Sequence, residues 1–578
     1  MPNESPTPPP RPAPDAVPIP RAAVPDSGPD GPVLDSGPSG PVRPAPDYLW
    51  ASFTERGPWI LDRSALAWAV GIDGIRERTK ASVAGLTAPR RLPPGLHTAR
   101  VVGHVAVALA GWVVVERRAR RRVGVDDVEA QRASITGLSR RLRERFAHLG
   151  PTYIKLGQIL SSGRGIFPDG LVNEFAKLRD RVPAESFATV IATIENELGA
   201  KASTVFRSIE PTPIAAASIA QVHAATLLDG TDVVIKVQRP GIGDTVRKDL
   251  AAMAWIAPFT VGRIPISALA NPPALVEVFA ETIVEELDFR LEAQNMLDCA
   301  TALAGLGQRA IVVPRPHPEY VTKRLLVMEP MRGFSFDDGD AMRAAGVDTE
   351  AVLRAGVSAA VESTTLYGVF HGDLHGGNMV VLPDGRSALL DFGITGRLSP
   401  SERRAYLSLM VANSINDTRG ALHALRDLGA LPPDTDLERV IADLGLDEPV
   451  PFDPTKMTGE EMVGQLQDIT KKLLGYGARL PKVLMLQIKN MVFLDSAIHA
   501  LAPQVDLISL FGEVFTRLLV EHGAQIAADV GIDPAKLKWD PSGFKTQMGL
   551  SDDVSTFTYD DLQARRRLIR RRLAGKAE

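Results

Sequence analysis

Two short motifs in this chain carry the residue types that phosphoryl transfer needs. Residues 371–378 read HGDLHGGN, and a short apolar hairpin separates them from DFG at residues 391–393. A carboxylate at Asp373 can face an acceptor, while the amide oxygen of Asn378 and the carboxylate of Asp391 are hard ligands for a cation held against phosphates. The spacing predicts phosphoryl transfer from Mg-ATP, with Asp373 as the catalytic carboxylate and Asn378 and Asp391 as metal ligands.

The two histidines of the first motif are expected to be structural. We expect His371 to brace the backbone of the loop. For His375, a structural hydrogen bond is expected rather than metal binding.

A strand upstream presents a lysine to the same chemistry. The β-prone runs 221–227 and 233–237 flank Asp229-Gly230, a pattern typical of a hairpin. Lys236 lies at the end of the second run, in VVIK, where a kinase-like lysine contacts the α- and β-phosphates. Lys236 is therefore predicted to bind nucleotide and to take part in catalysis.

An acidic segment is expected to position that lysine. Residues 275–296 have apolar side chains at helical spacing and a dense acidic face. Glu292 is the predicted ion-pair partner of Lys236. Glu286 and Asp288 form a second acidic pair, but residues two apart on a regular helix point to nearly opposite sides. Either the helix is interrupted there, or the two acids serve different partners.

The expected nucleotide-binding loop and hinge differ in how strongly the sequence indicates them. No glycine-rich loop precedes the hairpin, and alanine's methyl group hinders close approach of a backbone to phosphates. The residues in that place are Ala215, Ala216, Ala217 and Ser218. Strand-like runs at 311–313 and 324–328 lead to Glu329 and Met331, which are a plausible hinge for adenine although strand-then-turn is a weak signal.

Composition limits the class of protein. The chain has 578 residues, 45% of them hydrophobic and 23% charged, and a net charge of -4, which gives no reason to expect nucleic acid as a partner. The single cysteine, Cys299, excludes an internal disulfide framework.

The first 46 residues hold 16 of the 45 prolines and are expected to be disordered. No secretory signal is recognised, and the catalytic part is expected in the cytoplasm, where ATP is found.

A short apolar run raises the question of a membrane. Residues 101–115 read VVGHVAVALAGWVVV, which is shorter than the ~20 residues of a spanning helix. A buried helix and membrane insertion or interfacial binding stay open as alternatives. The flanking arginines 117, 118 and 120–122 favour an anionic membrane surface. A second basic cluster, at 565–572, is more typical of a solvated helix.

The segment after DFG enters a helical pattern almost at once, with Ser399 as the expected N-cap. No long activation segment and no APE anchor are found, which favours a small-molecule or lipid acceptor, or ATP hydrolysis alone. Residues from about 400 to 545 are expected to be helical. The most apolar stretch, LPKVLMLQIKNMVFLDSAIHAL, is expected to pack in the core.

Residues 149–158, LGPTYIKLGQ, add a further motif. Lys155 and Gln158 are three residues apart and share a helix face. Together with the loops above, Lys155, Gly157 and Gln158 resemble the KxGQ signature of the UbiB/AarF-type atypical kinase family, whose members are tied to isoprenoid-quinone biosynthesis. The resemblance covers roughly residues 130 to 500.

This resemblance implies an α+β fold with the two lobes of a protein kinase, a helical KxGQ extension at the N-terminal side and a helical C-terminal region. It implies ATP and Mg²⁺ as cofactors, and an alanine-rich loop at residues 215–218. It also implies that the KxGQ helix covers the cleft, with Lys155 reaching the acids Glu286 and Asp288. Candidate partners are then a nucleotide, a lipid or quinone precursor, and the inner face of the cell membrane.

The sequence departs from the family pattern in three places. The usual Arg-x-Asp-x-x-Pro run is compressed at residues 164–168 and lacks its Asp. Gly376 replaces a proline of the catalytic loop, which is expected to loosen it. A strongly apolar C-terminal hairpin is missing.

Two other functions compete with a UbiB-type kinase or ATPase. One is a small-molecule phosphotransferase of the aminoglycoside or choline kinase sort, and the other is a nucleotide-gated regulatory module without turnover. The expected organisation is a disordered tail (1–48), a helical and membrane-associated segment (49–125), the KxGQ extension (126–200), the N-lobe (201–332), the C-lobe with its helices (333–545) and a basic tail (546–578).

Overall fold

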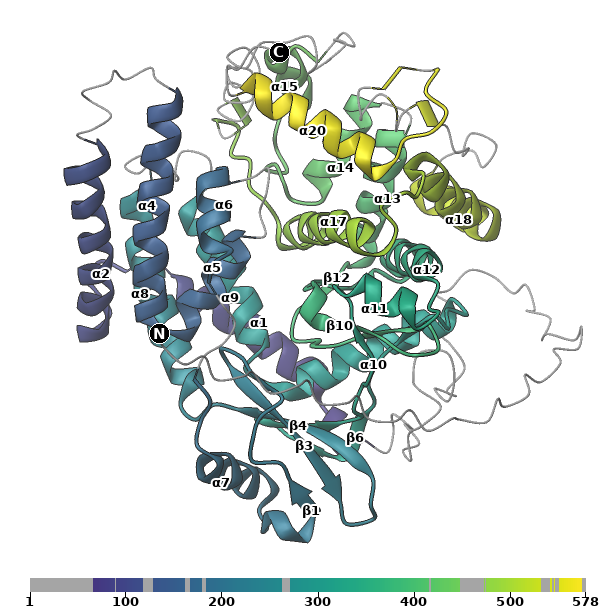
Figure 1. Cartoon of the computed structure of the whole chain (residues 1–578). Helices are drawn as coiled ribbons and strands as arrows, with labels where there is room; N and C mark the ends of the chain where they lie inside the picture. The colour runs from purple at the N-terminus through teal and green to yellow at the C-terminus, as the bar shows by residue number, and fades with distance from the viewer. Residues whose placement is uncertain are drawn as a thin grey trace, which may run out of the picture. The chain divides into compact units, whose positions relative to one another are not determined.

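A six-stranded antiparallel sheet builds the first lobe around the predicted hairpin (Figure 1). β3 (Ala220–Leu227) pairs along its length with β4 (Asp232–Gln238), and Gly230 in the turn has a φ of 95°, a value that favours glycine. The strand order is β1-β3-β4-β7-β6, with β2 also paired to β3. The other strands are β1 (Phe206–Ile209), β2 (Ala215–Ala216), β6 (Pro316–Val321) and β7 (Leu325–Met328). The predicted hairpin is confirmed, whereas β6 was not anticipated.

The computed structural model describes only part of the chain. The described residues are 66–88, 90–117, 128–161, 167–178, 183–261, 271–414, 417–446, 472–473, 475–531, 541–542, 545, 550–551 and 553–573. The expected disordered tail, the arginines at 118–122 and most of the compressed run at 164–168 lie outside them.

Two helices, not one, occupy the acidic segment beside the sheet. α9 (Pro272–Glu285) ends before the acidic pair, and α10 (Phe289–Gly305) begins immediately after it. Asp288 caps α10 by accepting a hydrogen bond from the backbone of Arg290. The helix is therefore interrupted at the acidic pair. The inner face of α10 is buried against β6 and β7.

The N-terminal helices pack on one another beside α9 (Figure 1). α5 carries the KxGQ residues and contacts α4, α6 and α8, and their apolar side chains share one core. The helices are α1 (Ile72–Thr87), α2 (Leu96–Trp112), α4 (Val128–Leu149), α5 (Pro151–Ser161), α6 (Asp169–Phe175), α7 (Phe187–Leu198) and α8 (Ile242–Thr260). α7 packs instead against β4 of the sheet.

One stretch among the described helices, Leu96–Val115, is long and apolar enough by length and composition to cross a membrane. Only 22% of its window is buried. The buried residues Val101, Ala108 and Trp112 lie on the face that contacts α4 and α8.

The second lobe combines short strands with helices. β9 (Val369–His371) pairs with β12 (Thr395–Arg397), which places the two motifs at neighbouring strand ends. A four-stranded sheet consists of β5 (Ile311–Val312), β8 (Phe334–Ser335), β10 (Met379–Val381) and β11 (Ser387–Leu389). Ser399 and Glu402 form a reciprocal capping box at the start of α13, which confirms the expected N-cap.

The C-terminal helices complete this lobe. They are α11 (Gly339–Ala344), α12 (Thr349–Glu362), α13 (Pro400–Ser414), α14 (Thr418–Asp427), α15 (Leu437–Leu444), α17 (Lys482–Leu501), α18 (Leu507–Val530) and α20 (Tyr559–Leu573). α12, α17 and α18 share a buried apolar core. The expected α+β class with kinase-like lobes and helical flanks is therefore confirmed.

Candidate active site

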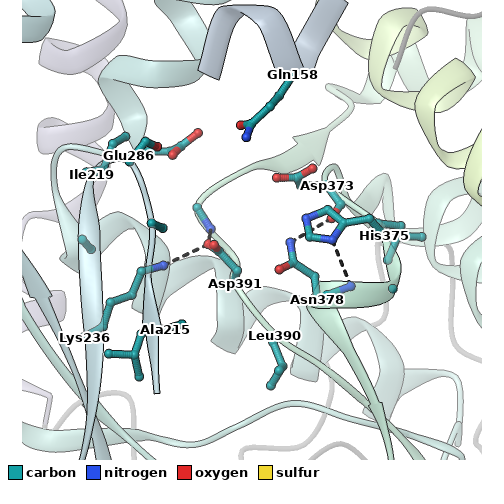
Figure 2. Close-up of a pocket in the computed structure, with 18 of the residues that line it drawn as sticks. Gln158, Ala215, Ile219, Lys236, Glu286, Asp373, His375, Asn378, Leu390 and Asp391 are labelled. Carbon is teal, nitrogen blue, oxygen red and sulfur yellow. Dashed lines mark hydrogen bonds and ion pairs between the residues drawn. The ribbon is translucent and has the colours of Figure 1, made fainter. Parts of the chain in front are cut away.

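A cavity of about 1160 Å³ collects the predicted motifs (Figure 2). The sheet with its alanine loop lines it from one lobe, and the catalytic loop and DFG line it from the other. α5 and α17 also contribute residues to its wall. Segments separated by more than three hundred residues therefore meet at one site.

Lys236 lies in the part of the cavity that we call the nucleotide side, after the predicted role of this lysine. Its Nζ atom is 2.7 Å from Glu292 Oε1 and 2.9 Å from Asp391 Oδ1. The predicted pairing with Glu292 is thus present, because the first turn of α10 carries Glu292 and faces the lysine. Burial raises the pKa of Glu292 to about 7, although Lys236 opposes that shift. Burial also works against charge on Lys236, yet the two carboxylates raise its pKa, so the ammonium stays charged.

His371 holds the catalytic loop in shape, as expected. Its Nε2 donates to the Leu390 carbonyl at 2.9 Å, and its Nδ1 accepts from the Asp373 backbone at 3.2 Å. Burial lowers the pKa of His371 to about 4, so the ring is neutral and can serve both bonds at neutral pH. The fixed tautomer connects the first motif to the strand that leads into DFG. His375 likewise accepts a structural hydrogen bond, from the Gly377 backbone.

The two predicted metal ligands, Asn378 and Asp391, both line the cavity. The Asn378 amide nitrogen donates to the Asp373 carbonyl at 3.0 Å, and Figure 2 shows its oxygen on the side of Asp391. Asp391 adopts a φ of 56°, unusual for a residue other than glycine, and its side chain is 41% exposed. Desolvation disfavours the charged form of the Asp391 carboxylate. The ammonium groups of Lys236 and Lys155 nevertheless hold the pKa of Asp391 well below its usual range.

These two oxygen donors fit a magnesium ion. Within the described part of the chain, no group of three or more His, Cys, Asp or Glu side chains could hold a metal unaided. Magnesium commonly takes one or two protein ligands and completes its octahedron with phosphate oxygens and water. Asn378 and Asp391 are the residues that would hold it here.

We call the part of the cavity around Asp373 the acceptor side, after the predicted role of this carboxylate. Two lysines from helices distant in sequence line it. Lys155 of α5 lies 3.2 Å from Glu286 and 3.7 Å from Asp373 Oδ2. Lys489 of α17 forms an ion pair with Asp373 Oδ1. Gln158 also lines the cavity, and Figure 2 shows it reaching in from α5. The KxGQ helix thus contributes Lys155 and Gln158 to the cavity wall beside Asp373.

Gly157 is needed for that placement. A Cβ atom at this position would come within 2.2 Å of Leu178 and 2.7 Å of Phe175. The glycine lets α5 lie directly on α6 and the turn after it. Its role is therefore close packing, one residue away from the cavity-lining Gln158.

The prediction for Asp288 is corrected by the break between α9 and α10. Its carboxylate caps α10 and pairs with Arg290 Nη2 at 2.6 Å. Glu286 lines the cavity and pairs with Lys155, whereas Asp288 is not among the lining residues. The irregular residues between the helices turn the two acids to different partners.

The alanine loop and hinge line the nucleotide side. Ala215, Ala216, Ala217, Ser218, Glu329 and Met331 all border the cavity. The Glu329 amide donates to the Arg315 carbonyl within the sheet, and its carboxylate accepts from the Arg315 backbone at 3.3 Å. Burial raises the pKa of Glu329 to about 7, against the opposing effect of Arg315. The side chain of Glu329 thus stabilises the hinge.

Two features of the site escaped sequence reasoning. Lys489 lies in a segment for which only core packing was expected. At Gly376, a Cβ atom would come within 2.2 Å of the Asp337 carboxylate. The glycine thus leaves room for the Asp337 carboxylate at the cavity wall. No local motif marks either contact.

Comparisons with known proteins agree with the motifs. A family model described as the ABC1 atypical kinase-like domain matches residues 177–425. An uncharacterized protein of Mycobacterium tuberculosis is 34% identical over 455 residues, which is 76% of this chain and 89% of that protein. An uncharacterized aarF domain-containing protein kinase of Arabidopsis thaliana, chloroplastic, is 30% identical over 391 residues, covering 64% of this chain and 72% of its own length.

Two further matches cover 66% and 60% of this chain. The chloroplastic protein ACTIVITY OF BC1 COMPLEX KINASE 1 of Arabidopsis thaliana is 31% identical over 396 residues, covering 66% of this chain and 56% of its own length. A solved complex of Rv3197 with erythromycin from Mycobacterium tuberculosis aligns at 22% identity and a TM-score of 0.35, over 60% of this chain and 91% of that one. By the sequence matches and the family model, the chain belongs to the UbiB/AarF-type, or ABC1, family of atypical kinase-like proteins.

Proposed function

We propose that this protein is an ATP- and Mg²⁺-dependent atypical kinase or ATPase that supports isoprenoid-quinone or other lipid metabolism at a membrane. The observation that carries the proposal is the double contact of Lys236, with Glu292 at 2.7 Å and Asp391 at 2.9 Å. Active protein kinases require a lysine–glutamate pair and a DFG aspartate in these places. All three groups meet at one place in this structure.

The side chains divide the work of transfer between them. Lys236 would neutralise the α- and β-phosphates of ATP, and Asn378 with Asp391 would hold Mg²⁺ beside them. Bound Mg²⁺ supplies charge neutralisation across the phosphates. Asp373 would orient the acceptor hydroxyl or water and take its proton.

A small or lipidic acceptor suits the acceptor side better than a polypeptide does. α5 covers this side, and Lys155 joins Glu286 to Asp373 within the covered space. A peptide strand would have to displace the KxGQ helix, which Gly157 packs tightly on α6.

Helix α2 offers a surface for that membrane. Its exposed apolar side chains lie away from the face buried on α4 and α8, and they are Leu96, Val102 and Val107. The π-helical turn Val113–Arg117, which follows α2 directly, adds the exposed residues Val113, Val114 and Val115. Apolar residues of this kind favour binding at the headgroup boundary. We place the protein on the cytoplasmic face of the cell membrane, where it has access to ATP.

Turnover of labelled ATP by the purified protein, with and without liposomes, tests the proposal. Release of phosphate that liposomes stimulate supports it. Phosphorylation of an added small alcohol points to a small-molecule phosphotransferase, and nucleotide binding without turnover points to a regulatory module.

Liposome flotation tests the membrane part separately. Val107→Glu on α2 is expected to reduce flotation. Val520→Glu on α18 is the matched control, because Val520 is also an exposed valine, at 79%. Equal flotation of both variants and the wild type would contradict the assignment of α2.

A further inference from the structure

α17 turns a cation toward the catalytic loop from outside the kinase core. Lys489, Val492, Phe493 and Ser496 recur at helical spacing and line the cavity. Lys489 pairs with Asp373 Oδ1, and the next residue, Asn490, donates to the His371 carbonyl at 2.9 Å. α17 is therefore fastened to the catalytic loop at two adjacent positions.

The catalytic loop itself has no cation for the group being transferred. Residues 373–378 read DLHGGN, without lysine or arginine. Phosphoryl transfer depends on positive charge around the moving group, because charge spreads over its three equatorial oxygens. The loop must therefore obtain that charge from another element.

Three lysines line the cavity, and two of them are committed by their positions. Lys236 lies between Glu292 and Asp391, where it meets the α- and β-phosphates. Lys155 comes from the covering helix α5 and lies closer to Glu286 than to Asp373. The third, Lys489, reaches the Asp373 carboxylate from the C-lobe and forms an ion pair with it.

We propose that Lys489 contacts the γ-phosphoryl group of bound ATP and stabilises its charge during transfer. The inference rests on the proposed function and adds a residue to it. The acceptor oxygen forms a bond to the γ-phosphorus as the bond from phosphorus to the ADP oxygen breaks, and the acceptor proton passes to Asp373. Lys489 keeps its proton throughout and exchanges part of its contact with Asp373 for the phosphoryl oxygens.

The proposal places a reaction-supporting residue outside the region that defines the family domain. The family model ends at residue 425, and α17 begins at Lys482. The helical C-terminal region would then complete the site instead of merely supporting the lobe.

The test is the preference for a triphosphate over ADP, which requires no turnover. Affinities of Mg-ADP and of the Mg-bound β,γ-imido analogue of ATP are measured by titration calorimetry for the wild type and for Lys489→Met. The ratio that favours the triphosphate is expected to fall about tenfold, as expected for one lost contact with a charged group. Lys489→Arg is expected to keep most of the ratio. Where the wild type turns over ATP, Lys489→Met is expected to lower kcat about 100-fold.

Lys482→Met is the matched control. Its side chain is on the same helix and 18% exposed, against 17% for Lys489, but it pairs with Glu285 outside the cavity lining. An unchanged triphosphate preference in Lys489→Met would overturn the inference alone, because a lysine that only holds Asp373 leaves this ratio unmoved. Failure of the wild type to bind either nucleotide would overturn the proposed function together with it.

Discussion

The two sides of the cavity are built in different ways. On the nucleotide side, Lys236, Glu292 and Asp391 all come from the kinase-like lobes and neutralise one another within 3 Å. On the acceptor side, Asp373 receives Lys155 from the N-terminal extension and Lys489 from the C-terminal helices. Under the proposed function, this contrast would assign the nucleotide to the kinase-like lobes and the acceptor to elements outside them.

The most severe test of the nucleotide side is Asp391→Asn. This change removes the charged metal ligand and one of the two anions beside Lys236, so affinity for Mg-ATP is expected to fall about 100-fold or more. Titration calorimetry measures it. Asp384→Asn is the control, because Asp384 forms an exposed pair with Arg386 in the neighbouring hairpin turn. Equal affinity in Asp391→Asn and wild type would refute the metal assignment.

On the acceptor side, Gly157→Ala should disturb packing without reaching the nucleotide. The added methyl would overlap Leu178 and Phe175, at an expected cost of about 1–3 kcal/mol of unfolding free energy. A lower Tm with unchanged Mg-ADP affinity is expected. Gly103→Ala is the control, since nothing lies within 4 Å of a Cβ there. A loss of nucleotide affinity as large as the loss of stability would break the proposed separation of the two sides.

The hinge of the nucleotide side predicts a dependence on pH. Because burial raises the pKa of Glu329 to about 7, the folded state holds a proton that the unfolded state has released, and stability from this group falls as pH rises from about 4.5 to 7. Glu329→Gln removes that loss. The free energy of unfolding of the variant, relative to wild type, should therefore be about 1–2 kcal/mol more favourable at pH 8 than at pH 5, with a correspondingly higher relative Tm. Thermal melts at both values measure this, and a pH-independent difference would contradict the assigned cause.

The smallest effect is expected at the alanine loop. Ala216→Gly frees the backbone to approach the phosphates and should change the relative affinities of ADP and ATP about threefold. Ala224→Gly on β3, outside the cavity lining, controls for the loss of strand stability. Identical relative affinities in the loop variant and the wild type would count against an influence of the alanine methyl group on the phosphates.

The sequence predicted the nucleotide side more fully than the acceptor side. Asp373, Asn378 and Asp391 are close in the chain, so their spacing and the hairpin between them were enough to bring them together. Lys236 and Glu292 followed from a strand and a helix of recognisable pattern. Most of this prediction therefore rested on residues close in sequence and on the patterns of single strands and helices.

The role of Lys489 and the partner of Asp288 were not predicted correctly, because both depend on packing between parts of the chain that are distant in sequence. Lys489 contacts a residue 116 positions away, and helical periodicity says only that its helix has an inner face, not what that face meets. Asp288 was placed with Glu286, as a partner of Lys155, because the family resemblance implied it. The break between α9 and α10 depends on how each helix packs, and it sends the two carboxylates in different directions.

The convergence of α5 and α17 on one carboxylate has a consequence for synthesis. A chain emerging from the ribosome exposes its catalytic loop and DFG well before α17 has been made. Until residue 489 has left the exit tunnel, Asp373 lacks its C-terminal partner, and the nascent lobe has only half of its acceptor wall. This wall of the cavity is thus completed only after residue 489 has been made.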